Sequence, residues 1–397
     1  MAEPIPVVLF DDGRGALAPV TDLRAAFDLR TGALTTLERL RRQDRFRLAG
    51  LRVPEALEAV TRQRHPDLAV NAPGQEPPRS LLVNGRWADA SCDEALQQVG
   101  DHDALVGRSG ALLAAWAQPG EAARRIGADL DGLTLHDVQT IDGAPATITR
   151  PWHIRTRRDF CLSFDLALLR AAAGAAGPVT QAPSAKVHPS AVLDTERGPI
   201  VLDEGAQVRP GAIICGPAYV GPHSVITERA IIRAGTAIGP VCKVGGEVGG
   251  TIFQGYSNKA HDGYLGDSYI GEWVNLGAGT TNSNLLNTYG EVIAWTAEGR
   301  AERTSETFLG CTLGDHVKMA ICTRIMTGAI VGTGTMWAAS APVTGAVGPF
   351  RWITDAGNRP YRFEKFMETV RAMMARRDQA PTEAYAARLR DLHEAAG

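Results

Sequence analysis

Aliphatic residues recur at every sixth position through the middle of the chain. The series begins at Leu202 and runs without a miss through Val208, Ile214, Val220, Ile226, Ile232, Ile238 and Val244. A small side chain stands four residues after most of these positions, as Ala206 and Ala212 do, and Gly or Pro often fills the places between. A period of six is neither that of an α-helix nor that of a simple strand. It predicts a solenoid in which each hexad forms one short strand, with the aliphatic side chain on the axis and the small one at a tight corner.

The same period extends beyond this run in both directions. It starts at Val187 and Leu193, and it returns at Leu313, Met319, Ile325, Val331, Trp337 and Val343. We therefore expect residues 178–350 to form a left-handed parallel β-helix of hexapeptide repeats. Between Val244 and Leu313 only Ile270 and Leu276 keep the period. A fold does not determine a function, so we expect the function where the repeat fails.

The flanking regions have a different character. Residues 1–177 alternate apolar strand patterns such as "PIPVVLF" with helical ones, which predicts an α/β domain. A Gly/Ala/Pro-rich stretch at 171–186 follows a predicted helix and places the boundary near Gly177. Residues 351–397 are expected to form a helical tail. Its apolar face is expected to pack against the rest of the molecule and consists of Phe363, Phe366, Met367, Val370 and Met374.

Composition narrows the function classes. The 397 residues include 41 Lys and Arg against 44 Asp and Glu, a net charge of −3, which argues against nucleic acid or an anionic membrane as partner. No apolar run approaches the roughly 18 residues of a membrane span, and the first residues lack the features of a signal peptide. The expectation is a soluble cytoplasmic protein. The six cysteines form no CxxC pair, which favours reduced, packed thiols.

The irregular stretch carries a family resemblance. "KAHDGYLGDSYIGEWVNLGAGTTNSN" (259–284) resembles the acetyltransferase half of the bifunctional bacterial N-acetylglucosamine-1-phosphate uridyltransferase/glucosamine-1-phosphate acetyltransferase. In that family a histidine, a tyrosine three residues later, YLGD, an asparagine, GAGT and a second asparagine follow in this order; here the four residues are His261, Tyr264, Asn275 and Asn284. The resemblance implies N-acetylation of an amino-sugar phosphate by acetyl-CoA, followed by nucleotidyl transfer, in a homotrimer.

Three further strings resemble a branch of that family with an atypical first domain. They are "NSNLLNTYGEV", "FLGCTLGDHVKMAI" and, near the N-terminus, "FDDGRGALAPVTDLRAAFDLR", which stands where the usual Gly-rich GxGTRM loop would be. Arg24 and Arg30 match the paired arginines of that branch, and they follow a strand and a turn, where α/β folds commonly hold phosphates. With Asn84 they are the expected binding residues for a nucleoside triphosphate. The candidate ligands for an accompanying Mg²⁺ are Asp11, Asp12 and Asp165.

The chemistry of acetyl transfer suggests a role for each residue of the irregular stretch. An attacking amine must lose a proton, and a histidine accepts one near pH 7, so His261 is the candidate base. The family resemblance assigns Tyr264 and Asn275 to the sugar phosphate and Asn284 to orienting substrate or donor. Arg233 is a further candidate for substrate binding and Glu247 for orienting the imidazole. Two lysines of the family pattern lack clear equivalents, and the residues available to supply their charge are Lys243, Lys259 and Lys318.

Two other readings remain open. A zinc hydratase on the same solenoid would need three histidines converging between subunits, and the chain has His188, His223, His261 and His316. A non-catalytic scaffold or sensor that binds nucleotide sugars, with a degenerate first domain, is the stronger alternative. An acetyl-transfer assay would separate it from an enzyme.

Overall fold

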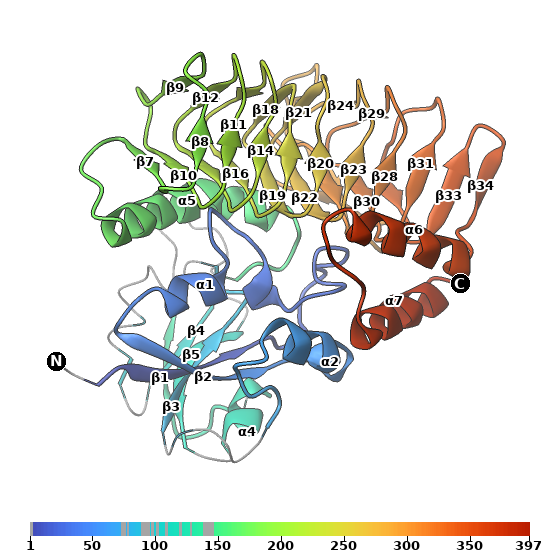
Figure 1. Cartoon of the computed structure of the whole chain (residues 1–397). Coiled ribbons are helices and arrows are strands. Elements are labelled where there is room, and N and C mark those ends of the chain that lie inside the picture. The colour runs from blue at the N-terminus through green and yellow to red at the C-terminus, as the bar shows by residue number, and fades with distance from the viewer. Residues whose placement is uncertain are drawn as a thin grey trace. The chain divides into compact units, whose positions relative to one another are not determined.

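The computed structural model divides the chain into two compact units (Figure 1). Unit 1 comprises residues 1–15, 23–29 and 34–149, and unit 2 comprises 16–22, 30–33 and 150–397. The structure describes all residues except 1–2, 73–76, 78, 89–95, 97–98, 101–102, 108–109, 119–120, 128 and 138–146.

Unit 1 is built on a mixed six-stranded sheet with strand order β2-β1-β3-β5-β4-β6. The two neighbours of β1, β2 and β3, both run parallel to it, whereas β5 is antiparallel to β3. The predicted α/β character is thus confirmed. The strands are β1 (Ile5–Phe10), β2 (Phe46–Arg52), β3 (Ser80–Asn84), β4 (Asp103–Val106), β5 (Leu112–Ala117) and β6 (Thr134–Asp137). The helices are η1 (Ala26–Asp28), α1 (Thr36–Arg41), α2 (Glu55–Arg64) and α4 (Ala122–Ile126).

Unit 2 is the predicted left-handed parallel β-helix, whose short strands stack into three parallel ladders. The first ladder comprises β7 (Val179–Gln181), β10 (Ile200–Leu202), β13 (Ala218–Val220), β16 (Thr236–Ile238), β19 (Ile252–Gly255), β22 (Tyr269–Glu272), β27 (Thr312–Leu313), β30 (Ile330–Val331) and β32 (Ala346–Val347). The second comprises β8 (Lys186–Val187), β11 (Gln207–Val208), β14 (Val225–Ile226), β17 (Lys243–Val244), β20 (Asn258–Lys259), β23 (Asn275–Leu276), β28 (Lys318–Met319), β31 (Met336–Ala338), β33 (Arg351–Thr354) and the antiparallel β34 (Gly357–Pro360).

The third ladder has two parts. They are β9 (Val192–Asp194), β12 (Ile213–Cys215), β15 (Ile231–Ile232), β18 (Glu247–Gly249) and β21 (Tyr264–Gly266), then the pair β24 (Thr281–Asn282) and β29 (Arg324–Ile325). The side chain of Asn282 joins the two parts, because its amide accepts from Gly266 N at 2.7 Å and donates to Gly266 O at 2.9 Å.

The residues of the six-residue period line the axis of the β-helix. All eight positions from Leu202 to Val244 belong to one buried core cluster, together with Ile270, Leu276 and Leu313. Small residues occupy the corners, and some of them bond the next coil: Ser224 Oγ donates to Gly239 O and Ser257 Oγ to Gly271 O, both at 2.7 Å. The predicted division between axis and corner positions is therefore confirmed.

The irregular stretch does not interrupt the coil, contrary to the simplest reading of its sequence. Val225 pairs with Lys243 and Lys243 with Asn258, so the coil shortens from 18 to 15 residues. The next coil, from Asn258 to Asn275, has 17 residues. The following coil carries an insertion between β24 and β27 that contains the hairpin β25 (Ile293–Trp295) and β26 (Ala301–Arg303). The period fails because the coil length changes, while the ladders continue.

Helix α5 (His153–Ala172) belongs by its contacts to unit 2. The contact boundary thus lies at Thr149, before this helix, whereas composition suggested a boundary after it, near Gly177. The tail forms α6 (Phe363–Ala375) and α7 (Glu383–Ala395), as predicted. Four of the five apolar residues expected on one face of α6 are buried, and Phe363 is half-buried.

Two further expectations concern the whole chain. The five described cysteines are free thiols, of which Cys161, Cys242 and Cys311 are buried and Cys322 is exposed; Cys92 lies outside the described residues. In the described part of the chain, no helix combines the length and apolar character that crossing a membrane requires.

Candidate functional site

The YLGD segment turns a corner of the β-helix. β21 ends at Gly266 and β22 begins at Tyr269, so Asp267 lies between the third ladder and the first. Its backbone has φ of +45°, a conformation that Asp and Asn adopt more readily than most residues. The corner therefore directs the Asp267 side chain away from the axis.

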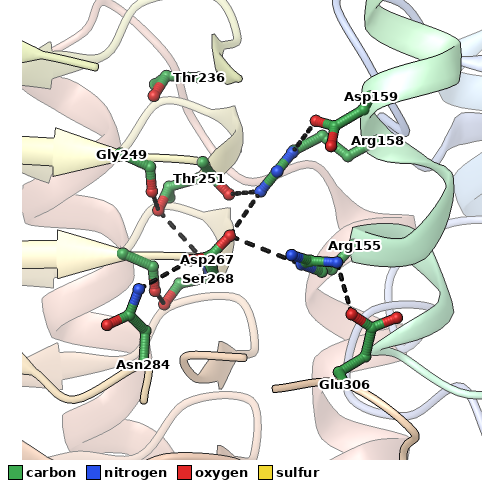
Figure 2. Close-up of polar contacts among 12 residues, drawn as sticks. Arg155, Arg158, Asp159, Thr236, Gly249, Thr251, Asp267, Ser268, Asn284 and Glu306 are labelled. Carbon is green, nitrogen blue, oxygen red and sulfur yellow. Dashed lines mark hydrogen bonds and ion pairs between the residues drawn. The ribbon is translucent and has the colours of Figure 1, made fainter. Parts of the chain in front are cut away.

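Asp267 is the centre of a polar network (Figure 2). Its Oδ1 accepts from Arg158 Nη1 at 2.9 Å and lies 3.6 Å from Arg155 Nε, and both arginines come from α5. Its Oδ2 accepts from Asn284 Nδ2 at 2.8 Å. The Arg158 and Asp267 side chains are 7% and 14% exposed, so this ion pair is largely shielded from water.

Arg158 is held on several sides. Nη1 also donates to the backbone oxygen of Gly250, and Nε donates to Asp159 at 2.8 Å. Burial acts to lower the pKa of Arg158, but the carboxylates of Asp159 and Asp267 outweigh it and raise the pKa. Glycine suits position 250, because φ is +56° and an added Cβ would lie 2.5 Å from Arg158 Nη1, which would have to move.

Asn284 connects this network to Tyr264. Its Nδ2 donates to Tyr264 Oη at 3.1 Å. Burial raises the pKa of Tyr264, with Asp267 and Glu247 adding to the effect. The phenol is therefore neutral near pH 7 and keeps a proton to donate.

Arg233 and Glu247 form an ion pair on the same ladder. Arg233 Nε lies 2.5 Å from Glu247 Oε1, and Glu247 is the register partner of Tyr264. Over the described ranges of the chain, no hydrogen bond or ion pair joins Glu247 to His261. Glu247, the residue predicted to orient the His261 imidazole, is thus paired with Arg233 instead.

His261 lies on the exposed loop between β20 and β21. It lines a surface pocket of about 490 Å³ together with Asp262, Glu228, Arg229 and Lys243. Within the described part of the chain its ring makes no hydrogen bond. The pocket carries two cationic and two acidic side chains, and the exposed imidazole is accessible to a substrate.

Asn275 lies apart from this group. It is in β23 of the second ladder, where its register partners are Asn258 and Lys318. Tyr264, Glu247 and Arg233 lie on the third ladder or directly after its strands. One chain therefore brings Tyr264, Asn284, Glu247 and Arg233 to one face and places Asn275 on another.

Lys259 occupies a core position of the second ladder and fixes the His261 loop. It is 1% exposed and follows Val244 in register. Its Nζ donates to the backbone oxygens of Gly245 at 3.3 Å, His261 at 2.6 Å and Asp262 at 2.8 Å. Burial lowers the pKa of Lys259 to about 8. Of the three lysines considered from the sequence, Lys243 alone is among the residues that line the His261 pocket.

This buried lysine predicts a pH-dependent stability. The pKa is about 8 in the folded state and about 10.4 when unfolded, so between these values the unfolded chain binds the extra proton and stability rises with pH. We expect the unfolding free energy of the wild type to rise by about 1.6 kcal/mol relative to Lys259→Met between pH 8 and pH 9.5. Urea unfolding of both proteins at the two pH values measures this. A constant difference would show that Lys259 does not titrate there.

A second polar cluster lies in unit 1, at the carboxyl ends of adjacent parallel strands. Phe10 of β1 is paired with Asn84 of β3, so the residues after β1 meet Asn84. Asp12 forms a bidentate pair with Arg86, Nε to Oδ1 and Nη2 to Oδ2, both at 2.7 Å. Asn84 Nδ2 donates to Asp12 Oδ2 at 3.2 Å. In α/β folds, ligands commonly bind just outside the carboxyl ends of parallel strands.

The two aspartates that follow β1, Asp11 and Asp12, both accept hydrogen bonds from other residues of the chain. Asp11 accepts from Gly13 N at 2.9 Å and from Ala26 N at 2.7 Å, and burial raises its pKa. Burial also acts to raise the pKa of Asp12, but the hydrogen bonds and charge of Arg86 outweigh it and lower the pKa. Among the residues that the structure describes, no group of three or more His, Cys, Asp or Glu could hold a metal ion.

The predicted nucleotide residues are divided between the units. Arg24 is buried in unit 1. Arg30 belongs to unit 2, where its backbone nitrogen donates to Gln254 Oε1 at 2.9 Å and its Nη1 donates to Ala33 O. Asp165 is buried on α5, also in unit 2. The proposed pairing of Arg24 with Arg30 thus stays a prediction.

The described chain thus combines a parallel β-helix of hexapeptide repeats with a mixed α/β unit. His261 lies on the turn before β21, whereas Tyr264 and Asn284 lie on and after strands of the third ladder. Residues 7–173 match the family model described as sugar nucleotidyl transferase. A segment of 148 residues is 32% identical to the bifunctional sugar-1-phosphate nucleotidylyltransferase/acetyltransferase of Sulfurisphaera tokodaii and covers 34% of each chain. Another of 105 residues is 33% identical to the bifunctional protein GlmU of Rippkaea orientalis, covering 22% of this chain and 23% of that one. The chain is similar to these relatives over the matched parts alone, which span about a quarter to a third of the relatives' length.

A solved structure gives a weaker likeness. The UDP-N-acetylglucosamine acyltransferase of Francisella novicida is 13% identical, with a TM-score of 0.21, over 53% of this chain and 90% of that one. The three ladders of the chain itself define the β-helix.

Sequence reasoning missed three residues of the network around Asp267. Asp267 is the last residue of the quoted YLGD string, but its role was not recognised. Arg155 and Arg158 stand three residues apart in "RTRRDF", a spacing that places both on one face of a helix. From this spacing, the sequence could have indicated that the two arginines act together.

Proposed function

We propose that unit 2 transfers an acetyl group from acetyl-CoA to the amine of an amino-sugar phosphate, with His261 as general base. The observation that carries this is the arrangement of an exposed His261 in a surface pocket, with Tyr264 and Asn284 hydrogen-bonded to each other on the strand and corner that follow in the chain. The base takes the amine proton as the amine attacks the thioester carbonyl, and the Tyr264 hydroxyl is a donor to substrate. Asn284 orients substrate or donor, and Arg233 contributes positive charge.

The test is a direct assay. Purified protein is incubated with acetyl-CoA and a panel of amino-sugar phosphates, and a thiol reagent reports the release of CoA. Turnover of one panel member supports the proposal. The absence of turnover with every member, while the protein binds a nucleotide sugar, favours the non-catalytic scaffold.

We propose that the active assembly is a homotrimer. The support is that Asn275 lies on a different ladder from Tyr264 and Asn284, so a site using all three would take residues from two copies of the chain. Closed cyclic symmetry is the usual way for identical chains to share such sites. Light scattering at micromolar concentration is expected to give three times the chain mass, and a stable monomer would refute this.

We propose that unit 1 binds a nucleoside triphosphate with Mg²⁺ and transfers a nucleotidyl group to the sugar 1-phosphate. The support is the family model over residues 7–173 and the polar strand edge at Asp12, Asn84 and Arg86. Metal-assisted positioning of phosphates would supply most of the rate, with Arg24 and Arg30 as the candidate phosphate residues. Calorimetry of the full chain with UTP and other triphosphates in Mg²⁺ is expected to show binding heat.

One observation favours a unit 1 that binds without catalysing. Asp11 is occupied by two backbone N–H groups and Asp12 by a bidentate arginine, so neither carboxylate is arranged as a metal ligand. Heat with a triphosphate that does not change when Mg²⁺ is removed would support this second candidate.

A further inference from the structure

The network around Asp267 connects α5 to residues of the proposed acetyl-transfer site. Arg155 and Arg158 both approach Oδ1 of Asp267, and Asn284 approaches Oδ2 (Figure 2). Asn284 in turn donates to the hydroxyl of Tyr264. A continuous chain of polar contacts therefore runs from a helix outside the repeats to the Tyr264 phenol.

We propose that Arg155 and Arg158, acting through Asp267, are positioning residues that fix which atoms Asn284 and Tyr264 present to substrate. This inference rests on the proposed acetyl transfer. It gives α5, the helix that follows unit 1 in the chain, a role in the chemistry of the β-helix.

The direction of each hydrogen bond follows from the chemistry of the groups. An ionised carboxylate only accepts, so Asn284 must turn its Nδ2 toward Asp267. The same Nδ2 donates its other hydrogen to Tyr264 Oη. The amide oxygen of Asn284 is then the atom left to accept from a ligand, and Tyr264 Oη, having accepted, has its own hydrogen to donate.

The reversed amide is disfavoured at this position. It would place the Asn284 oxygen where Nδ2 now lies, 2.8 Å from the carboxylate oxygen of Asp267, so two acceptors would face each other. Tyr264 would then have to donate to Asn284, and its hydroxyl hydrogen would be lost to the substrate. The charge of Asp267 therefore selects one orientation of two groups.

The arginines keep that carboxylate charged and in place. A carboxylate shielded from water is costly unless it is paired, and the Arg158 guanidinium lies 2.9 Å from it. Arg155 also pairs with Glu306 through Nη1 at 2.6 Å. Glu306 lies near the end of the insertion that leaves the coil at Asn284, where Leu309 N donates to Asn284 O at 2.9 Å. Arg155 thus ties Asp267 to the segment that carries Asn284.

The test compares two variants and their combination. Asp267→Asn keeps the shape and suits φ of +45°, but an amide can accept or donate, so it no longer selects the orientation of Asn284. We expect the variant to lose about 10- to 30-fold in kcat, the scale of one hydrogen bond in the transition state, with KM for acetyl-CoA within about twofold. Arg158→Gln should lose a similar factor, and Arg158→Lys should recover part of it.

The double variant and a matched control distinguish positioning from general stabilisation. If Arg158 acts through Asp267, Arg158→Gln with Asp267→Asn should be no slower than the worse single variant. Arg150→Gln is the control, because it breaks the Arg150–Glu302 pair, 2.7 Å, just before α5 without touching Asp267, and its kcat should match the wild type.

Three outcomes would overturn the inference. An unchanged kcat in Asp267→Asn, losses that multiply in the double variant, or an equal loss in Arg150→Gln would each do so while leaving acetyl transfer established. A wild type that acetylates no amino-sugar phosphate would overturn the proposed function and this inference together.

Discussion

Replacing His261 by alanine is expected to lower the rate of acetyl transfer at least about 100-fold, the scale of a lost general base. The loss should fall on kcat, because the proton is removed as the amine attacks and binding contributes little. The melting temperature should stay near that of the wild type, since the ring is exposed, makes no hydrogen bond among the described residues and lies off the apolar axis. Rates with the preferred substrate and a thermal melt of each protein measure both effects.

A matched control is available on an earlier coil. His188 is also exposed on a turn of the β-helix, where its Nδ1 lies 2.8 Å from Ser190 Oγ. His188→Ala should change neither the rate nor the melting temperature. If His261→Ala unfolds the protein, or acetylates as fast as the wild type, then His261 is a structural residue and the base lies elsewhere.

The β-helix could be predicted from the sequence because one local rule is repeated many times. Each axis position buries one aliphatic side chain, and a single exception hardly weakens a series of eight. By the same rule, residues 245–312 resembled an interruption of the β-helix, because few aliphatic residues there keep the six-residue period. Lys259 stands at a core position, and a count of apolar residues cannot recognise a lysine whose charge is satisfied by three carbonyl oxygens inside the turn.

The proposed site was only partly predictable, for a related reason. The resemblance identified His261, Tyr264 and Asn284, and two of these are in contact in the structure. It could not give their partners, because Asp267 and the arginines of α5 meet only when a helix more than one hundred residues away in the chain packs on the corner. The sequence also could not show that Glu247, the candidate to orient His261, forms an ion pair with Arg233.

Unit 1 gave the weakest sequence signal. Its atypical "FDDGRG" string identified two aspartates as metal candidates, but a string does not show which charges meet across the sheet. Arg86 lies on the turn that follows β3 and neutralises Asp12. We expect this pairing to make Asp12 a buried structural partner rather than a metal ligand, and this expectation has a measurable consequence.

Asp12→Ala is expected to destabilise unit 1 by about 3–5 kcal/mol, the usual cost of removing one partner from a buried ion pair. Arg86 is 2% exposed and Asp12 3% by side chain, so the variant leaves a guanidinium shielded from water with its main counter-charge gone. Asp67→Ala is the matched control, because Asp67 pairs with Arg41 at 2.8 Å on the surface with 61% of its side chain exposed. An exposed pair of this kind contributes at most about 1 kcal/mol. Urea unfolding of the full chain measures both variants.

The pH dependence and a second variant separate the structural role of Asp12 from a metal-binding one. The pKa of Asp12 is lowered in the folded state, so its contribution to stability is present above the usual carboxylate pKa and is lost as pH falls through the lowered value. The wild type should therefore approach Asp12→Ala in stability at low pH. Asp12→Asn with Arg86→Leu removes both charges and should recover part of the loss, because no unpaired charge remains buried. If Asp12→Ala is as stable as the wild type but loses triphosphate binding only in the presence of Mg²⁺, then Asp12 is a metal ligand and Arg86 releases it when the nucleotide binds.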